Sequence, residues 1–136
     1  EKGYRYWSAD VTPDDTPWEA GLGFCVRLDK GEFIGRASLL AQRARGLDRR
    51  LVCLALRDGR AVAFGGEPIL HGHRVVGRTT SGGYGYTVGV PIAYGYVPTR
   101  SAGAGTLLAV EAFGEAIPAE VRLEPLYDPR GERVRT

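Results

Sequence analysis

A chain of 136 residues is long enough for one domain with a sizeable hydrophobic core. Its composition, 43% hydrophobic and 25% charged, is that of an ordinary globular protein, and a formal net charge of +2 favours neither a nucleic-acid nor a membrane partner. No apolar run reaches the roughly 20 residues of a membrane helix, and no secretory signal pattern opens the sequence. Because there is no methionine and the first residue is glutamate, we expect the chain to begin inside a longer polypeptide.

The first 46 residues are predicted to form a connector made of a turn, a strand and a helix. Thr16-Pro17-Trp18-Glu19 has the pattern of a capping box, and Gly21 ends that helical turn at once. Residues 22–28 follow as a short apolar strand. A helix over residues 33–45 is predicted from apolar residues at offsets of three and four, with Gly46 as its cap. These apolar residues are Phe33, Ala37, Leu40, Ala41 and Ala44.

Residues 47–136 have the composition of an all-β domain, either a barrel or a sandwich. Short apolar segments alternate with glycine-rich turns, which is typical of antiparallel strands. The predicted strands are residues 50–57, 67–71, 74–79, 92–97, 107–113 and 117–123. Residues 51–56 are apolar at every position, so we expect this strand to be covered on both faces. Pro91 and Pro98 bracket their strand, as proline should.

The two cysteines, Cys25 and Cys53, each sit in an apolar run and lack the spacing of a disulfide framework or metal site. We therefore predict buried free thiols, which fit a reducing, cytoplasmic compartment. His71 and His73 have no third ligand near them in the sequence, so no metal site is predicted there.

Several segments, taken in order, resemble the folate-dependent aminomethyltransferases. This family includes the glycine-cleavage T-protein and the folate-binding halves of sarcosine and dimethylglycine dehydrogenases, and the resemblance is nearest to the dehydrogenase branch. The segments are residues 10–40, Arg49-Arg50-Leu51-Val52-Cys53-Leu54, Val75-Val76-Gly77, Thr80-Ser81-Gly82-Gly83-Tyr84-Gly85-Tyr86, Ile92-Ala93-Tyr94-Gly95-Tyr96-Val97-Pro98 and Pro125-Leu126-Tyr127-Asp128-Pro129. The resemblance implies a mainly β fold, an antiparallel barrel preceded by the connector and packed beside a larger folate-binding body.

The resemblance also implies how function is divided. The family's catalytic aspartate and its folate-binding glutamate lie in the earlier body, so no catalytic residue is expected here, and Asp10, Asp14 and Asp15 belong to a turn. The expected cofactor is tetrahydrofolate, shared with the upstream domain, with FAD only if a dehydrogenase domain precedes. The donor would be a small methylamine or aminomethyl compound.

Three aromatic residues are candidate folate contacts. The resemblance places Phe24 at a folate-contacting position, although a short apolar strand would equally make it a core residue. The Trp18 indole could face the ligand, but anchoring of the turn is favoured. Tyr84 lies in the glycine-rich segment 80–86, for which a plain β-hairpin or domain-packing loop is favoured over ligand contact.

A basic cluster offers a further contact, and other functions stay open. Arg43, Arg45, Arg49 and Arg50 could meet the glutamate tail of folate, or form a solvated helix end. The main alternative function is a stand-alone, non-catalytic β-barrel binding module. An oligonucleotide-binding barrel would need basic residues interleaved with aromatics along strands. A folate-binding relative that aids iron–sulfur assembly would carry Lys-Gly-Cys-Tyr-x-Gly-Gln-Glu, which is absent from this sequence.

Overall fold

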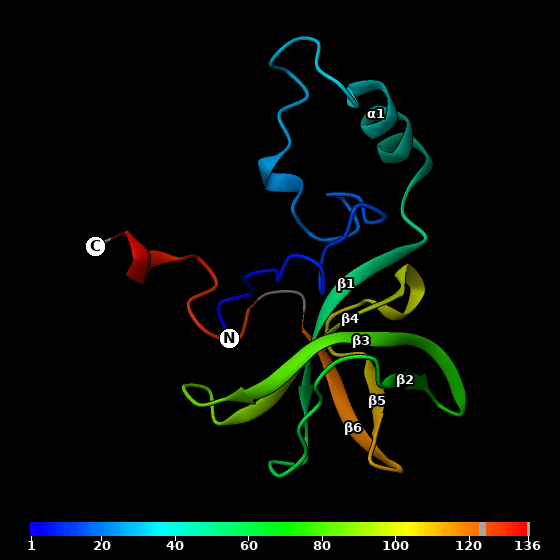
Figure 1. The fold of residues 1–136 in the computed structure, drawn as a ribbon, viewed down its shortest axis with the longest axis vertical. Coiled ribbons are helices and arrows are strands. Elements are labelled where there is room, and N and C mark those ends of the chain that lie inside the picture. Colours follow the sequence, from blue (N-terminus) through cyan, green and yellow to red (C-terminus); the bar gives the residue numbers. More distant parts are fainter. Residues whose placement is uncertain (123–124, 136) are drawn as a thin grey trace.

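Six antiparallel strands close into a barrel, and the connector projects from one end of it (Figure 1). The computed structural model describes residues 1–122 and 125–135. Around the barrel the strands follow the order β1, β4, β3, β2, β5, β6. Their bounds are β1 (Arg49–Leu56), β2 (Pro68–His71), β3 (Arg74–Gly85), β4 (Val90–Pro98), β5 (Leu107–Ala112) and β6 (Glu115–Arg122). The mainly β fold with an antiparallel barrel is confirmed. Residues 123, 124 and 136 of the predicted barrel region lie outside the described residues.

Strand β1 is buried on both faces, as its unbroken apolar sequence predicts. Val52 and Leu54 point into the barrel and join its central cluster. Leu51 and Cys53 point outward into a second cluster, where Tyr94 of β4 packs with them. Alternate residues of one strand thus stabilise two separate cores. The predicted burial of Cys53 is also confirmed, since 4% of its surface is exposed.

The glycine-rich segment 80–86 forms one arm of the β3–β4 hairpin, as favoured from the sequence. The predicted strand 74–79 was too short, because β3 runs on through a bulge near Thr79 to Gly85. Gly82 shows why glycine belongs inside this strand. A Cβ atom there would lie 2.3 Å from the carbonyl oxygen of Ala63, so only glycine permits this approach of the two backbones.

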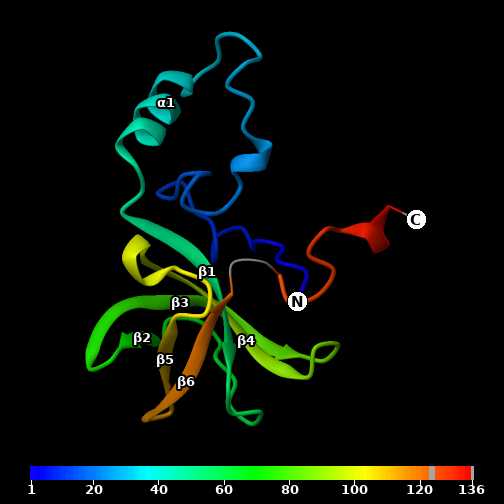
Figure 2. The ribbon, with the colours of Figure 1, turned by 180° about the vertical axis from the view of Figure 1, so that it is seen from behind.

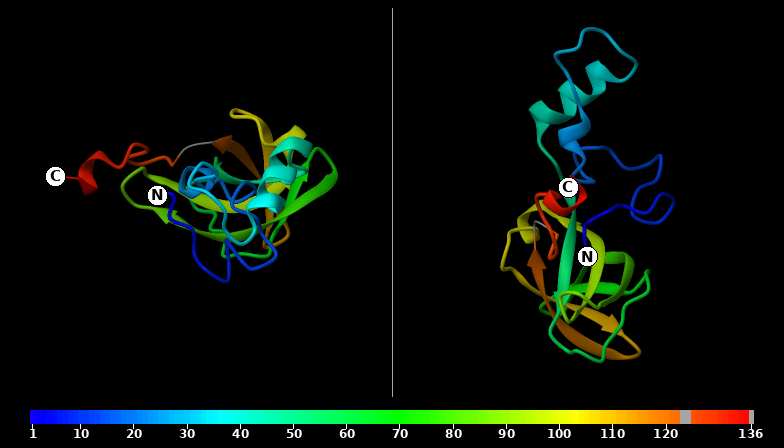
Figure 3. Two further views of the ribbon diagram at one scale, coloured as in Figure 1. Left: turned by 90° about the horizontal axis from the view of Figure 1, so that it is seen from above. Right: turned by 90° about the vertical axis from the view of Figure 1, so that its left-hand side faces the viewer.

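The connector lies over one end of the barrel and reaches away from it (Figures 2 and 3). It contains a 3-10 turn, η1 (Gly23–Cys25), and one α-helix, α1 (Arg36–Arg45). Among residues 21–46, Gln42 is the single buried residue. This part of the connector therefore contributes little to the hydrophobic core of the described chain.

The predicted strand over residues 22–28 is wrong, and so is the predicted burial of Cys25. The segment forms turns and η1 instead, and Cys25 is exposed. Its apolar residues resemble a strand in sequence, but no described strand lies beside it to complete the backbone hydrogen bonds. Gly21, with a φ of +70°, turns the chain before a strand can begin.

Helix α1 is confirmed, but it starts later than predicted and its apolar face is uncovered. Gly35 has a φ of +90°, outside the helical range, so the helix starts at Arg36 rather than near Phe33. The helix ends at Arg45, and the backbone N–H of its predicted cap, Gly46, donates to Gln42 O at 3.0 Å. Of the predicted apolar face, Ala37, Leu40, Ala41 and Ala44 are exposed. Within the described part of the chain, no helix is both long and apolar enough to cross a membrane.

The C-terminal segment returns to the N-terminus (Figure 2). Tyr127 N donates to Glu1 O at 3.2 Å, and Lys2 Nζ lies 3.8 Å from Asp128 Oδ2. Two further short 3-10 turns, η2 (Thr99–Ser101) and η3 (Glu132–Val134), complete the described structure.

Candidate functional site

A cavity of about 670 Å³ lies within the connector, between its first turn and the end of α1. It reaches the first residues of β1, so the connector and the barrel both contribute to its wall. Its lining residues are Trp18, Gly21, Gly23, Phe24, Val26, Gln42, Arg43, Gly46, Leu47 and Arg50. The set combines two aromatic rings with two arginines.

The structure brings two of the three predicted contact residues, Trp18 and Phe24, to this one cavity. The indole Nε1 of Trp18 donates to the carbonyl of Leu39 at 3.1 Å and so ties the first turn to α1. The hydrogen bond fits the anchoring role favoured for Trp18, and its contact with folate remains a prediction. Phe24 is 81% exposed and is not a core residue of the described chain. Its contact with folate remains a prediction.

Gly23 lies close against the ring of Trp18 in the cavity wall. A Cβ atom on Gly23 would lie 2.8 Å from Cζ3 of the Trp18 ring, closer than real contacts allow. The absence of a side chain therefore lets η1 pack directly on the indole face. Phe24, the next residue, also lines the cavity.

The basic cluster predicted from the sequence separates into different roles. Arg43 and Arg50 line the cavity, whereas Arg45 does not. Within the described residues, neither Arg43 nor Arg50 forms an ion pair. Their charges therefore face the cavity uncompensated, which favours an anionic group there. Arg49 points elsewhere.

Tyr84, the third predicted contact, lies apart from this cavity. It borders a smaller hollow of about 360 Å³ beside the N-terminal segment, together with Tyr4, Tyr6 and Tyr94. Its hydroxyl donates to the carbonyl of Gly89 across the hairpin at 3.1 Å. Its ring meets Tyr86 edge to face, with centroids 5.1 Å apart. These contacts fit a hairpin residue, and a ligand role for Tyr84 is not supported by its position relative to Trp18 and Phe24.

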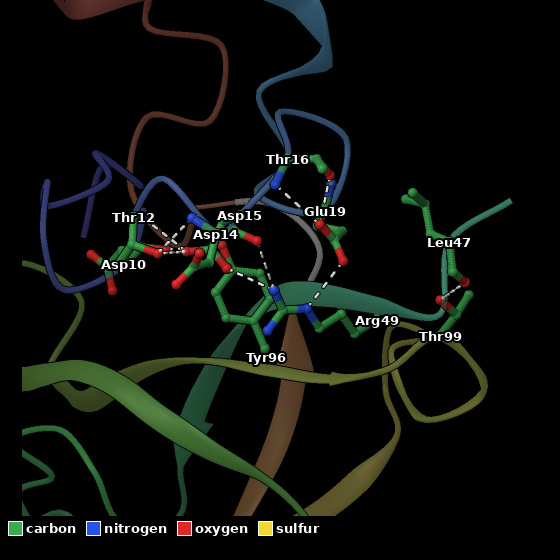
Figure 4. Close-up of polar contacts among 10 residues, drawn as sticks. All are labelled: Asp10, Thr12, Asp14, Asp15, Thr16, Glu19, Leu47, Arg49, Tyr96 and Thr99. Atoms are coloured by element: carbon green, nitrogen blue, oxygen red, sulfur yellow. Dashed lines mark hydrogen bonds and ion pairs between the residues drawn. The ribbon is translucent and has the colours of Figure 1, made fainter. Parts of the chain in front are cut away.

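Arg49, at the start of β1, is bound by the acidic turn of the connector, residues 14–19 (Figure 4). Its Nε donates to Glu19 Oε1 at 3.0 Å, and its Nη2 donates to Asp15 Oδ1 at 2.9 Å. The capping box is formed as predicted: Thr16 N donates to Glu19 Oε2 at 3.0 Å, and Glu19 N donates to Thr16 Oγ1 at 3.3 Å. Burial acts to raise the pKa of the Glu19 carboxyl, but hydrogen bonds from Thr16 and Arg49 outweigh it and hold that pKa below its usual value.

Asp10 is a buried residue whose role the sequence did not reveal. Only 2% of it is exposed, and its carboxylate accepts hydrogen bonds from Tyr6 N at 2.9 Å, from Ser81 Oγ at 2.7 Å and from the hydroxyl of Thr80. These donors lie about 70 residues away or in the same turn, so no local motif signals the contact. Asp10 thus fastens the N-terminal segment to β3, and it belongs to a turn as the sequence indicated.

The histidines show no clustering with acidic groups or thiols. His71 Nδ1 lies 3.2 Å from Ser101 Oγ, at the end of β2. Within residues 1–122 and 125–135, no group of three or more His, Cys, Asp or Glu residues is arranged to hold a metal ion.

Comparison with known proteins gives one consistent family. The family described as "Glycine cleavage T-protein C-terminal barrel domain" matches residues 49–128. The crystal structure of the glycine cleavage system aminomethyltransferase T from Bartonella henselae superimposes with a TM-score of 0.86 at 30% sequence identity. That match covers 94% of this chain and 36% of the Bartonella chain.

Full-length relatives are much longer than this chain. Mitochondrial sarcosine dehydrogenase of Mus musculus is 42% identical over 143 residues, a match that covers 99% of this chain and 16% of that protein. Mitochondrial dimethylglycine dehydrogenase of Homo sapiens is 41% identical, with 93% of this chain and 15% of that protein covered. An aminomethyltransferase of Nostoc sp. is 44% identical, with 93% and 34% covered. The chain therefore spans about a sixth of the dehydrogenases and about a third of the aminomethyltransferases.

Proposed function

The chain belongs to the glycine-cleavage T-protein family, and we propose that it completes the tetrahydrofolate cleft of a protein that transfers one-carbon units. Catalysis would take place in an upstream body of the same polypeptide, which would also bind the aminomethyl or methylamine donor. FAD would be a second cofactor only if that body includes a dehydrogenase domain. The chain described here would supply one wall of the cleft.

The observation that carries this proposal is the composition of the connector cavity. Tetrahydrofolate has a flat ring system at one end and carboxylates at the other. The rings of Trp18 and Phe24 offer surfaces on which a flat ring system can pack. Arg43 and Arg50, unpaired within the described residues, offer donors for a carboxylate. Both halves of the ligand thus have matching groups in the same cavity.

The exposed face of the connector supports an upstream partner. Ile34 is fully exposed, Leu40 is 40% exposed and Phe24 is 81% exposed. Such residues cost free energy in water and gain it when another surface covers them. In the aminomethyltransferase relatives about two thirds of the chain lies outside the match, which is enough for a body that covers this face.

A reducing compartment fits the two free cysteines. The cytoplasm therefore remains our prediction for the location of this chain. The mammalian relatives are mitochondrial by name, and a mitochondrial matrix would fit the free thiols equally well.

Titration calorimetry with tetrahydrofolate tests the proposal. The longer polypeptide should bind, whereas residues 1–136 alone should bind weakly. Arg50→Leu and Phe24→Ala should each weaken binding by about tenfold or more, the loss expected for one charge-assisted hydrogen bond or one aromatic contact. Arg45→Leu is the control, because Arg45 is an arginine of the same predicted basic cluster but lies outside the cavity, at the end of α1.

Two results would contradict the proposal. No binding by the longer polypeptide would refute a folate cleft. Tight binding by residues 1–136 alone would place the whole site in this chain and favour the alternative, a stand-alone binding module without an enzymatic partner.

A further inference from the structure

Tyr96 of β4 supports the connector from the barrel side with two different contacts. Its hydroxyl donates to the backbone carbonyl of Asp10 at 2.9 Å. Its ring lies under the guanidinium of Arg49, with Cζ 4.6 Å from the ring centroid. One barrel side chain thus meets the connector backbone and also supports the arginine that binds the acidic turn (Figure 4).

Each carboxylate bound by Arg49 uses its two oxygens for different purposes. Asp15 Oδ2 accepts from Thr12 N at 2.8 Å, while Oδ1 accepts from Arg49. Glu19 Oε2 accepts from Thr16, while Oε1 accepts from Arg49. One oxygen therefore shapes the turn, and the other fixes the turn to β1. A planar guanidinium with separate N–H groups suits this task better than a single ammonium.

The carboxylates of Asp15 and Glu19 are largely buried, so they depend on Arg49 to compensate their negative charge. The Asp15 and Glu19 side chains are 8% and 13% exposed, whereas Arg49 is 42% exposed. Removal of the guanidinium would leave two poorly hydrated negative charges in contact with the barrel, which is costly. The turn would then be expected to swing into water and recover hydration.

The neighbours of these residues in sequence belong to the cavity. Trp18 directly precedes Glu19, and Arg50 directly follows Arg49. Leu51 N also donates to Glu19 O at 2.8 Å and joins the same two segments through the backbone. The contact between Arg49 and the acidic turn therefore fixes the distance between an aromatic wall and a basic wall of the cavity.

We propose that Arg49 and Tyr96 are positioning residues, which hold the acidic turn (residues 14–19) on the barrel and thereby set the spacing of the cavity walls at Trp18 and Arg50. The identity of the ligand in this inference rests on the proposed function, whereas the structural role of Arg49 and Tyr96 does not. Neither residue lines the cavity. Arg49 acts through its neighbour Arg50 and through Glu19, whereas Tyr96 acts through Arg49.

Amide-resolved hydrogen exchange tests the structural part on the full chain. In Arg49→Leu, exchange at Thr16, Glu19, Ala20 and Leu51 should rise by at least about tenfold, because these amides are hydrogen-bonded within or to the turn. Amides of β5 and β6 should not change. Arg49→Lys should give an intermediate rise. Arg57→Leu is the control, since Arg57 forms an ion pair of 3.4 Å with Glu120 just beyond the other end of β1.

Tetrahydrofolate binding by the longer polypeptide tests the positioning part. Arg49→Leu should raise the dissociation constant by about tenfold or more, Arg49→Lys should recover part of the loss, and Arg57→Leu should leave binding unchanged. Unchanged exchange in Arg49→Leu would overturn the inference, and so would raised exchange with unchanged binding. If the unaltered polypeptide does not bind tetrahydrofolate, the proposed function fails, and the exchange result alone supports or overturns the hold of Arg49 on the turn.

Discussion

Gly77 of β3 offers a sharp test of how closely the barrel strands approach one another. A Cβ atom at this position would lie 2.0 Å from the carbonyl oxygen of Tyr96, and backbone atoms cannot yield as a flexible side chain can. Real contacts of this kind stay above 3.0 Å, so Gly77→Ala requires β3 and β4 to separate by about 1.0 Å here.

The cost of this separation follows from overpacking and from the hydrogen bonds that it lengthens. Inserting a methyl group into a packed site costs about 1–3 kcal/mol, and a weakened backbone hydrogen bond adds about 0.5–1.5 kcal/mol. Alanine returns about 0.5–1 kcal/mol, because it loses less conformational entropy on folding than glycine. We therefore expect Gly77→Ala to lower the free energy of unfolding by about 2 kcal/mol.

Gly83 is the matched control on the same strand. A Cβ atom there meets nothing within 4 Å, and its φ is not positive, so Gly83→Ala should be neutral or stabilising by up to about 1 kcal/mol. Urea unfolding of residues 1–136, followed by circular dichroism, measures both variants. If the two variants unfolded at the same urea concentration, the close approach of β3 to Tyr96 would not exist in solution.

The remaining predictions concern titration, thiol chemistry and the N-terminal segment. Because the pKa of Glu19 is lower in the folded chain than in the unfolded one, its contribution to stability is complete above the unfolded value near 4.5 and is lost as pH falls further. Urea midpoints should therefore fall more steeply below pH 4.5 in the unaltered chain than in Glu19→Gln, and parallel curves would contradict this. Cys25 should react with a thiol reagent in the folded chain, whereas Cys53, whose buried thiol has a raised pKa, should react only on unfolding; equal rates would contradict the burial described. Asp10→Ala should expose residues 1–10 to limited proteolysis while the barrel stays intact, because it removes the acceptor of three hydrogen bonds; an unchanged digestion pattern would show that other contacts hold the segment.

The parts of the structure that the sequence predicted are those with local causes. The capping box at Thr16, the helix end at Gly46 and the double burial of β1 each follow from residue types at short spacing. The barrel strands were also predicted nearly to their ends, except for β3. There Gly82, expected as a turn residue, permits the close approach of two backbones inside a strand.

The parts that the sequence analysis missed depend on contacts between residues far apart in the sequence, or on the absence of such contacts. Residues 22–28 are apolar enough for a strand, but within the described chain no strand pairs with them. The link between Asp10 and Ser81 joins residues 71 positions apart, so no sequence window contains both. For the candidate site, Trp18 and Phe24 were named in advance, but the separation of Arg49 from Arg50 could be read only from the structure.

Because Arg49 and Arg50 face different groups, the register of β1 determines which arginine is neutralised as well as which residues are packed in the core. Arg49 pairs with Pro98 and Arg50 with Val97, and successive side chains of a strand point to opposite faces. A slip of one residue would exchange the faces of the two arginines, turning Arg49 away from Asp15 and Glu19 and Arg50 away from the cavity. Arg49 and Arg50 thus differ in their chemical surroundings only because successive side chains of a strand face opposite sides.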